Sequence, residues 1–256
     1  MKDEILNGLK KIEKENGVTV LLAVESGSRG WGFASPDSDY DIRFVYKYPS
    51  ALDYLKLGRL QDDIVLFDGK KDYAGYDIKK YYTLLSKSNM NAIDYVFNTL
   101  IYIDNLQNKQ KLQEIIENGF DRNVYISHNY GLCAKNYHKY FEVPKEKEPT
   151  AKRYVYCIRA LLSAKYCADT GKLAPLNFYE LLEHVKLDGE DKTEIKELVE
   201  LKKKDREKKW YRNSKWDSWI RDALNSGHLK SSLGGERELY LERLNEHLLD
   251  QFERFL

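Results

Sequence analysis

One segment near the N-terminus limits the fold more than any other part of the chain. An apolar run, Val18–Val24, leads to Gly27-Ser28, a spacer rich in Gly and Ser follows, and a second run, Tyr40–Tyr46, begins beside Asp39 and Asp41. The length and branching of the first run predict a strand buried on both faces. Alternation along the second run places both Asp carboxylates on one face, opposite the tyrosine between them. The chain therefore has to build a sheet in which two strands meet at a glycine-rich loop and a carboxylate pair.

The carboxylate pair and the Gly-Ser turn together indicate phosphoryl chemistry. Two adjacent carboxylates repel each other unless a cation lies between them. Hard oxygen ligands suit Mg²⁺, which takes its remaining ligands from substrate phosphates. A Gly-Ser turn that begins a helix presents backbone N–H groups to a phosphate, and its small residues allow a close approach. A phosphate cradle beside a carboxylate pair predicts transfer of a phosphoryl group to a hydroxyl.

The rest of the chain predicts a small α/β unit followed by a helical unit. Ile64–Phe67 is expected to form a further strand, and Asp72–Tyr76 to continue the pairing after a turn. From Asp77 onward the apolar spacing is almost wholly helical. Two prolines flank the charged stretch Val143–Thr150, which marks a boundary. We expect an α/β domain with a helical extension over residues 1–143 and a helical domain over residues 150–256, with helices near 151–169, 177–185, 190–210 and 236–255.

Composition excludes several classes of protein. Lys and Arg number 42 against 41 Asp and Glu, so no global positive field marks the chain as a nucleic-acid binder. The three cysteines form no metal-binding cluster and their odd number argues against a disulfide framework. The N-terminus opens a charged amphipathic helix rather than a signal peptide, and no apolar run approaches the ~20 residues that span a bilayer. We expect a soluble cytoplasmic protein without a membrane partner.

The string GSRGWGFASPDSDYDIRFVY, residues 27–46, resembles the signature of the DNA polymerase β nucleotidyltransferase superfamily. It is similar in particular to a bacterial and phage branch, the RNA repair pathway DNA polymerase β family. The resemblance continues into Gly75–Lys80 and Leu84–Asn89 and resumes at Lys152–Arg159, and together these pieces span most of residues 20–165. The C-terminal ninety or so residues match only in helical character.

The resemblance implies a small mixed-sheet nucleotidyltransferase domain, an NTP donor such as ATP, and two divalent ions, Mg²⁺ with Mn²⁺ as an alternative. Asp39 and Asp41 would hold the metal. The superfamily adds a third carboxylate on a later strand, and we predict Asp77, because it lies in the matched Gly-Tyr-Asp motif; Asp72 is the next candidate. A purely structural role is the alternative, since Asp77 precedes a helical stripe and Asp is a good N-cap.

The residues expected to bind the triphosphate are Gly27, Ser28, Arg29, Lys152 and Arg159. Lys152 and Arg159 share one face of the first helix after the boundary, seven residues apart. Their cations would neutralise the triphosphate, and Arg would bind it bidentately. The alternative is an ordinary solvated helix face.

The acceptor is predicted to be an RNA end, which the resemblance favours without settling the acceptor. Lys202–Arg212 interleaves basic and aromatic residues and supports single-stranded nucleic acid as a partner, although a solvated helix end has the same composition. The near-neutral charge favours a protein hydroxyl or a small molecule instead. A nucleotide-binding module without catalysis is the third alternative, and the intact Asp pair argues against it.

Overall fold

The computed structural model describes the 256 residues apart from 59, 143–148, 205–210, 228–235 and 253–256. The chain forms two compact units from interleaved segments. The first contains Met1–Gly30, Asp39–Asp121 and Gly235–Leu256, and the second contains Trp31–Ser38 and Arg122–Gly234. The boundary predicted at 143–150 falls within the second unit, and most of it lies outside the described residues.

A mixed five-stranded sheet, in the order β3-β4-β2-β1-β5, forms the centre of the first unit. The strands are β1 Thr19–Glu25, β2 Tyr40–Lys47, β3 Asp63–Asp68, β4 Lys71–Asp77 and β5 Ile101–Asp104. β2 and β4 run parallel, and the other neighbours are antiparallel. The first four strands confirm the sequence prediction, whereas β5 was not predicted and lies in the part of the chain expected to be almost wholly helical. It is a four-residue, half-exposed edge strand, so neither length nor alternation marks it in the sequence.

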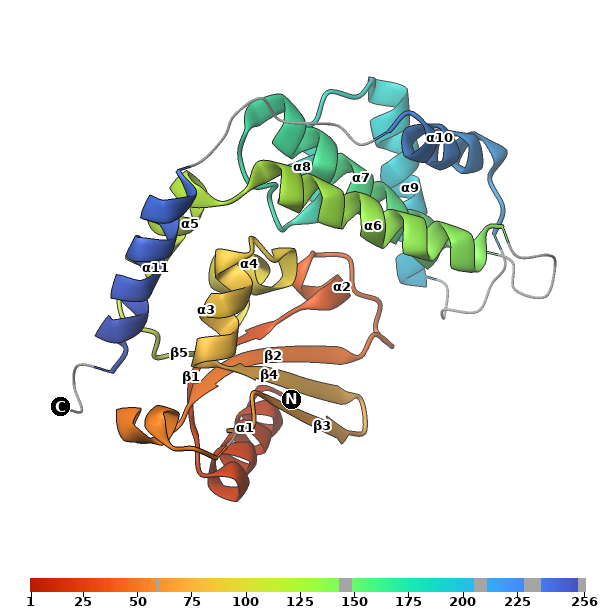
Figure 1. Ribbon diagram of the computed structural model, residues 1–256. Helices are drawn as coiled ribbons and strands as arrows, with labels where there is room; N and C mark the ends of the chain where they lie inside the picture. The colour runs from red at the N-terminus through yellow and green to blue at the C-terminus, as the bar shows by residue number, and fades with distance from the viewer. Residues whose placement is uncertain (59, 143–148, 205–210, 228–235, 253–256) are drawn as a thin grey trace. The chain divides into compact units, whose positions relative to one another are not determined.

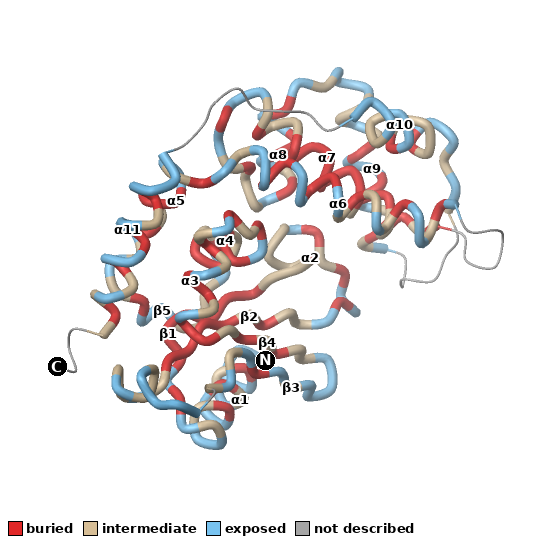
Figure 2. Tube along the Cα trace, viewed as in Figure 1, coloured by how far each residue is buried: buried red, intermediate tan, exposed pale blue. Residues whose placement is uncertain are grey.

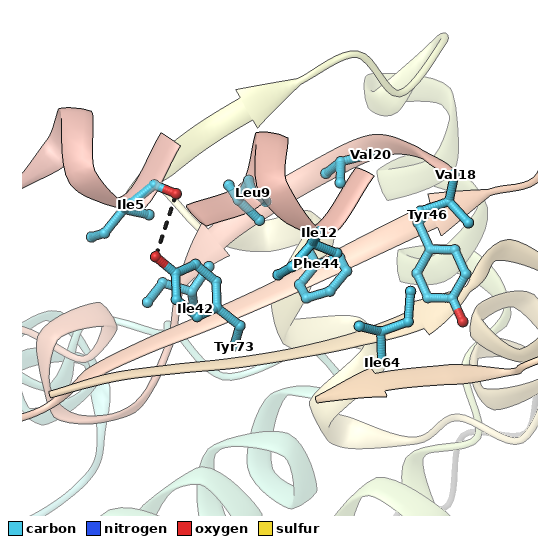
Figure 3. Packing of buried hydrophobic residues seen from close by; sticks show 11 residues of the cluster. Ile5, Leu9, Ile12, Val18, Val20, Ile42, Phe44, Tyr46, Ile64 and Tyr73 are labelled. Atoms are coloured by element: carbon cyan, nitrogen blue, oxygen red, sulfur yellow. Dashed lines mark hydrogen bonds between the residues drawn. The ribbon is translucent and has the colours of Figure 1, made fainter. Parts of the chain in front are cut away.

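Helix α1, Lys2–Asn16, packs against one face of this sheet. Its buried stripe of Ile5, Leu9 and Ile12 joins a core cluster with Ile42 and Phe44 of β2 (Figure 3). Figure 2 shows β1 buried along most of its length, as predicted from its continuous apolar run. Side chains alternate along a strand. Asp41 and Arg43, which alternate with Ile42 and Phe44, therefore point to the opposite face of the sheet.

Helices α3, Ile78–Ser86, and α4, Met90–Phe97, lie on that opposite face (Figure 1). The C-terminal helix α11, Arg237–Asp250, packs against α3 and against α5, Lys109–Gly119. A short 3₁₀ helix, Ala51–Leu55, follows β2. The first unit is thus a three-layer arrangement in which the sheet lies between α1 and the α3–α4 pair.

The second unit is helical. It consists of α6 Arg122–Tyr140, α7 Ala151–Thr170, α8 Phe178–His184, α9 Gly189–Lys204 and α10 Ser214–Asn225. The α/β-plus-helical fold class is therefore confirmed, although α10 was not among the expected helices. Across the residues that the structure describes, no helix combines the length and the apolarity that crossing a bilayer requires.

The spacer between the Gly-Ser turn and the Asp pair belongs to this helical unit. The backbone N–H of Phe178 donates to the Trp31 carbonyl at 2.9 Å. The ammonium of Lys202 is buried and donates to the Phe33 carbonyl at 2.8 Å. The beginning of the basic stretch predicted to contact nucleic acid therefore holds the spacer, and residues 205–210 of that stretch lie outside the described residues.

His247 of α11 is fully buried in the first unit. Its Nδ1 lies 2.6 Å from the Tyr82 hydroxyl and its Nε2 lies 3.0 Å from the Asn108 carbonyl oxygen. Burial lowers the pKa of this imidazole below its ordinary value, although the contact with Asn108 opposes the shift. The unfolded chain takes up this proton at higher pH than the folded protein does. The stability that depends on neutral His247 is therefore complete above about pH 6.5 and is lost as the pH falls below it.

We expect the free energy of unfolding to carry a His247 component that falls by at most ~1.4 kcal/mol per pH unit below about pH 6.5. A His247→Gln variant lacks this component. The free energy of unfolding of wild type minus that of the variant should therefore be smaller at about pH 5.5 than at about pH 7.5. Burial also raises the pKa values of Glu25 and Asp77, so these two groups contribute more stability as the pH falls. Wild type and His247→Gln share this contribution, and it cancels in the difference between them. Urea denaturation at the two pH values measures the difference, and a difference that does not change with pH would contradict the expectation.

Candidate active site

Asp41 of β2 has Asp72 of β4 as its neighbour across the parallel ladder. Directly paired residues on adjacent strands point to the same face of a sheet. Phe67 of the edge strand β3 pairs with Asp72 on its other side and is 73% exposed. The Asp41 and Asp72 side chains are 32% and 28% exposed. The two carboxylates therefore lie side by side on a part of the sheet face that solvent reaches.

The Gly-Ser turn lies against the same carboxylate. Gly27 has a positive φ of 59°, and a Cβ at this position would clash with Oδ2 of Asp41. Only glycine satisfies both the conformation and the close approach. The backbone N–H of Ser26 donates to the Asp41 carbonyl at 2.8 Å, and Ser28 is buried in the short helix α2, Gly27–Gly30. The structure thus brings Gly27, Ser28 and Asp41 together.

Asp39 and Arg29 lie beside this turn. Asp39 is exposed and directly precedes β2. The Nε of Arg29 donates to the Asp39 carbonyl at 3.1 Å, and its guanidinium carbon lies 3.8 Å from the centre of the Tyr40 ring. Both contacts hold Arg29 beside the carboxylate motif, and its predicted contact with a triphosphate stays a prediction.

Arg43 links the two paired carboxylates. Its Nη2 lies 3.2 Å from Oδ1 of Asp41 and 2.9 Å from Oδ2 of Asp72. Its Nη1 donates to the backbone carbonyl of Asp72 at 3.0 Å. A cation at this position offsets the repulsion between the carboxylates. Arg43 lies two residues after Asp41 on β2, so strand alternation places it on the same face, and that spacing is the sequence signal for its position.

Glu25 is a buried support that the sequence analysis missed. Its Oε1 accepts a hydrogen bond from the Asp41 backbone N–H at 3.0 Å, and its Oε2 accepts one from the Tyr102 hydroxyl. Burial raises the pKa of this carboxyl, and the two hydrogen bonds oppose that shift. Glu25 ends the apolar run of β1, and Tyr102 lies on the unpredicted strand β5, so their pairing could not be read from the sequence.

Asp77 lies at the other end of β4. It pairs with Tyr46, five residues beyond the Asp41–Asp72 pair, which is about 17 Å along the strand. Its side chain caps α3 by accepting from the Lys79 N–H at 2.8 Å, and it also accepts from the Tyr54 hydroxyl at 2.6 Å. Burial raises the pKa of its carboxyl despite these bonds. The structure therefore does not bring Asp77 together with the Asp pair, and helix capping accounts for its position.

Arg159 and Lys152 belong to α7 in the second unit. Arg159 is only 4% exposed, and its guanidinium carbon lies 4.0 Å from the centre of the Trp31 ring. Tyr156, on the same face of α7, meets Trp31 edge-on with ring centroids 5.3 Å apart. Arg159 therefore does not lie on a solvated helix face, which was the alternative. Lys152 is half-buried. Their contact with a triphosphate stays a prediction.

The carboxylate oxygens at this site are the type of ligand that a hard divalent cation such as Mg²⁺ prefers. Asp41 and Asp72 both reach the same nitrogen of Arg43, so they already share one cation, and exposed Asp39 is close in sequence. Within the described part of the chain, no three His, Cys, Asp or Glu side chains converge as a metal-binding group. Asp41 and Asp72 would thus hold an ion together with substrate oxygens, and the contact of Asp39 with that ion stays a prediction.

Comparisons with known proteins cover nearly the whole chain. A model of the RNA repair pathway DNA polymerase beta family matches residues 1–250. YcgL of Bacillus subtilis (strain 168) is 30% identical over 208 residues, which are 81% of this chain and 78% of that protein. A crystal structure of a nucleotidyltransferase-like protein from Exiguobacterium sibiricum 255-15 aligns over 96% of this chain and 78% of that one, at 11% identity and a TM-score of 0.31. The family match includes segments of both compact units.

Proposed function

Because the chain belongs to the RNA repair pathway DNA polymerase beta family, we propose that it moves an NMP from an NTP to a hydroxyl acceptor, with an RNA end as the acceptor. The observation that carries this proposal is the register pair of Asp41 and Asp72 beside the Gly27 turn. Paired carboxylates at a glycine turn on an open sheet face suit metal-assisted phosphoryl transfer. The family supplies the nucleotide donor and the link to RNA repair.

In the proposed reaction the acceptor hydroxyl oxygen forms a bond to the α-phosphorus. The bond from that phosphorus to the oxygen bridging to the β-phosphate breaks, and pyrophosphate leaves. The hydroxyl proton passes to a carboxylate, for which we assign Asp72 in place of Asp77, since Asp72 lies beside Asp41. Glu25 fixes the backbone that carries Asp41 through its bond to the Asp41 N–H.

Magnesium would be held by Asp39, Asp41 and Asp72, and the resemblance implies a second divalent ion. When bound, it supplies positive charge that stabilises the transition state and the leaving pyrophosphate. Gly27, Ser28 and Arg29 are the proposed contacts of the β- and γ-phosphates, because they adjoin Asp41 and Asp39.

The acceptor is tested by incubating the full-length protein with each α-labelled NTP, Mg²⁺ and either total cell RNA or RNA-free lysate. Label in RNA that survives protease digestion supports the proposal. Label confined to protein or small molecules supports the second acceptor class, which the net charge of +1 favours. Nucleotide binding without any transfer would contradict both and indicate a binding module. An Asp41→Asn variant prepared in parallel controls for contaminating polymerases.

Arg159→Ala tests the proposed triphosphate contact of α7. Charge-assisted bonds contribute about 1.5–3 kcal/mol each, so the variant should bind a nonhydrolysable NTP at least ~10-fold more weakly while its affinity for the monophosphate is unchanged. Arg159→Lys should recover part of the loss, because the ammonium keeps the charge but loses the planar fork. Calorimetry with both ligands measures this. A Trp31→Leu variant, which removes the ring under Arg159, controls for loss of packing. Equal losses for the two ligands in Arg159→Ala would refute the contact.

A further inference from the structure

The guanidinium of Arg43 occupies the place between Asp41 and Asp72 that the proposed function gives to a divalent cation. It bonds to one oxygen of each carboxylate, at 3.2 and 2.9 Å. It is also anchored to the backbone, because Nη1 donates to the carbonyls of Asp72 at 3.0 Å and Ile42 at 3.2 Å. These four contacts fix the cation at the centre of the carboxylate pair.

We infer that Arg43 is a resident counter-ion that competes with the divalent metal and makes metal loading depend on the nucleotide. The inference rests on the proposed function, since it concerns the same carboxylates. Asp41 and Asp72 are directly paired on adjacent strands, so the sheet keeps them together with or without the arginine. Arg43 is therefore not needed to assemble the ligands, and its main effect on an incoming cation is repulsion.

The nucleotide changes this balance. A triphosphate adds negative charge and further oxygen ligands at the carboxylates, which favours the metal over a single guanidinium. Metal and nucleotide thus bind with positive coupling, and the coupling is reciprocal. When the charge of Arg43 is removed, metal affinity should depend less on whether a nucleotide is bound. Arg43 is a positioning residue in this scheme, because it acts through the carboxylates.

The inference is tested by Mn²⁺ titration of the full-length protein, with free Mn²⁺ followed by electron paramagnetic resonance. Arg43→Gln should bind Mn²⁺ about tenfold or more tightly than wild type without nucleotide, and the ratio should fall toward one with a saturating nonhydrolysable NTP. Arg43→Lys keeps the charge on a flexible stem and should lie between the two, which also provides a result if Arg43→Gln does not fold.

Lys80→Gln is the matched control. Lys80 also bridges two carboxylates, Asp62 at 3.2 Å and Asp63 at 3.1 Å, in the same unit but away from the site. Its removal should leave Mn²⁺ affinity unchanged. Asp41→Asn tests the proposed metal site separately from the role of Arg43. If Asp41→Asn weakens Mn²⁺ binding but neither Arg43 variant strengthens it, the inference is wrong and the proposed function stands. If Asp41→Asn has no effect on Mn²⁺ binding, the proposed metal site and the inference both fail.

Discussion

Asp41→Asn should reduce nucleotide transfer by ~10³-fold or more, because it removes a charged ligand from the centre of the proposed metal site. Asp39→Ala should have an effect of similar size. Metal-free stability should change by no more than ~1 kcal/mol, because the half-exposed bond from Asp41 to Arg43 is a weak contribution and Arg43 keeps its bonds to Asp72. Asparagine has nearly the same shape and preserves the close packing against Gly27.

Initial rates of label transfer and thermal unfolding without metal measure the two effects separately. Asp68→Asn is the matched control, because Asp68 is an exposed carboxylate of the same sheet whose ion pair, at 2.9 Å, is with Lys71 and not with Arg43. The control should retain wild-type activity. Activity within tenfold of wild type in Asp41→Asn would contradict the assignment of the metal site.

Asp72→Asn and Asp77→Asn should differ strongly although both substitutions lie on β4. Asp72→Asn should lower turnover by ~10³-fold, because Asp72 neighbours Asp41 and is the proposed proton acceptor. Asp77→Asn should leave turnover nearly unchanged, since the Asn carbonyl caps a helix as well as Asp does and its NH₂ group, in place of Oδ2, can donate to the Tyr54 hydroxyl oxygen. The expected loss of stability for Asp77→Asn is at most ~1 kcal/mol.

Steady-state kinetics at saturating NTP and urea denaturation of both variants make this comparison. The opposite result, with Asp77→Asn inactive and Asp72→Asn active, would return the third carboxylate to the residue that the sequence analysis preferred. Loss of turnover in both, with folding intact, would mean that the capped end of β4 also acts on the reaction.

The sheet around the site could be predicted because its strands carry strong local signals. Ile42 and Phe44 alternate with Asp41 and Arg43, and burial follows that alternation in the structure. The conformational demand on Gly27 is likewise local, because its contact is with the carboxylate of the same motif. Elements with weak patterns were missed, as the half-exposed edge strand β5 shows.

The carboxylate that lies beside Asp41 could not be identified from the sequence, because its position depends on the register between strands. Asp72 and Asp77 are both acidic residues of β4, but alternation puts them on opposite faces, and only pairing with β2 shows that Asp72 is on the face of Asp41. The motif whose resemblance favoured Asp77 lies at the other end of β4 from the residue that pairs with Asp41. Arg159 packs on Trp31, which is far from it in the chain. Helical spacing within α7 could not predict this contact.

The most direct test of nucleotidyl transfer compares ATP labelled at the α-phosphate with ATP labelled at the γ-phosphate, using wild-type protein, Mg²⁺ and cellular RNA. A nucleotidyltransferase joins the α-phosphorus to the acceptor and releases the β- and γ-phosphates as pyrophosphate. We predict that α-label enters the acceptor in proportion to pyrophosphate released, that γ-label appears only in pyrophosphate, and that Asp72→Asn abolishes both signals. The same comparison is repeated with the other three NTPs if ATP is not used. Entry of γ-label into the acceptor, or α-label transfer that persists in Asp72→Asn, would contradict the account.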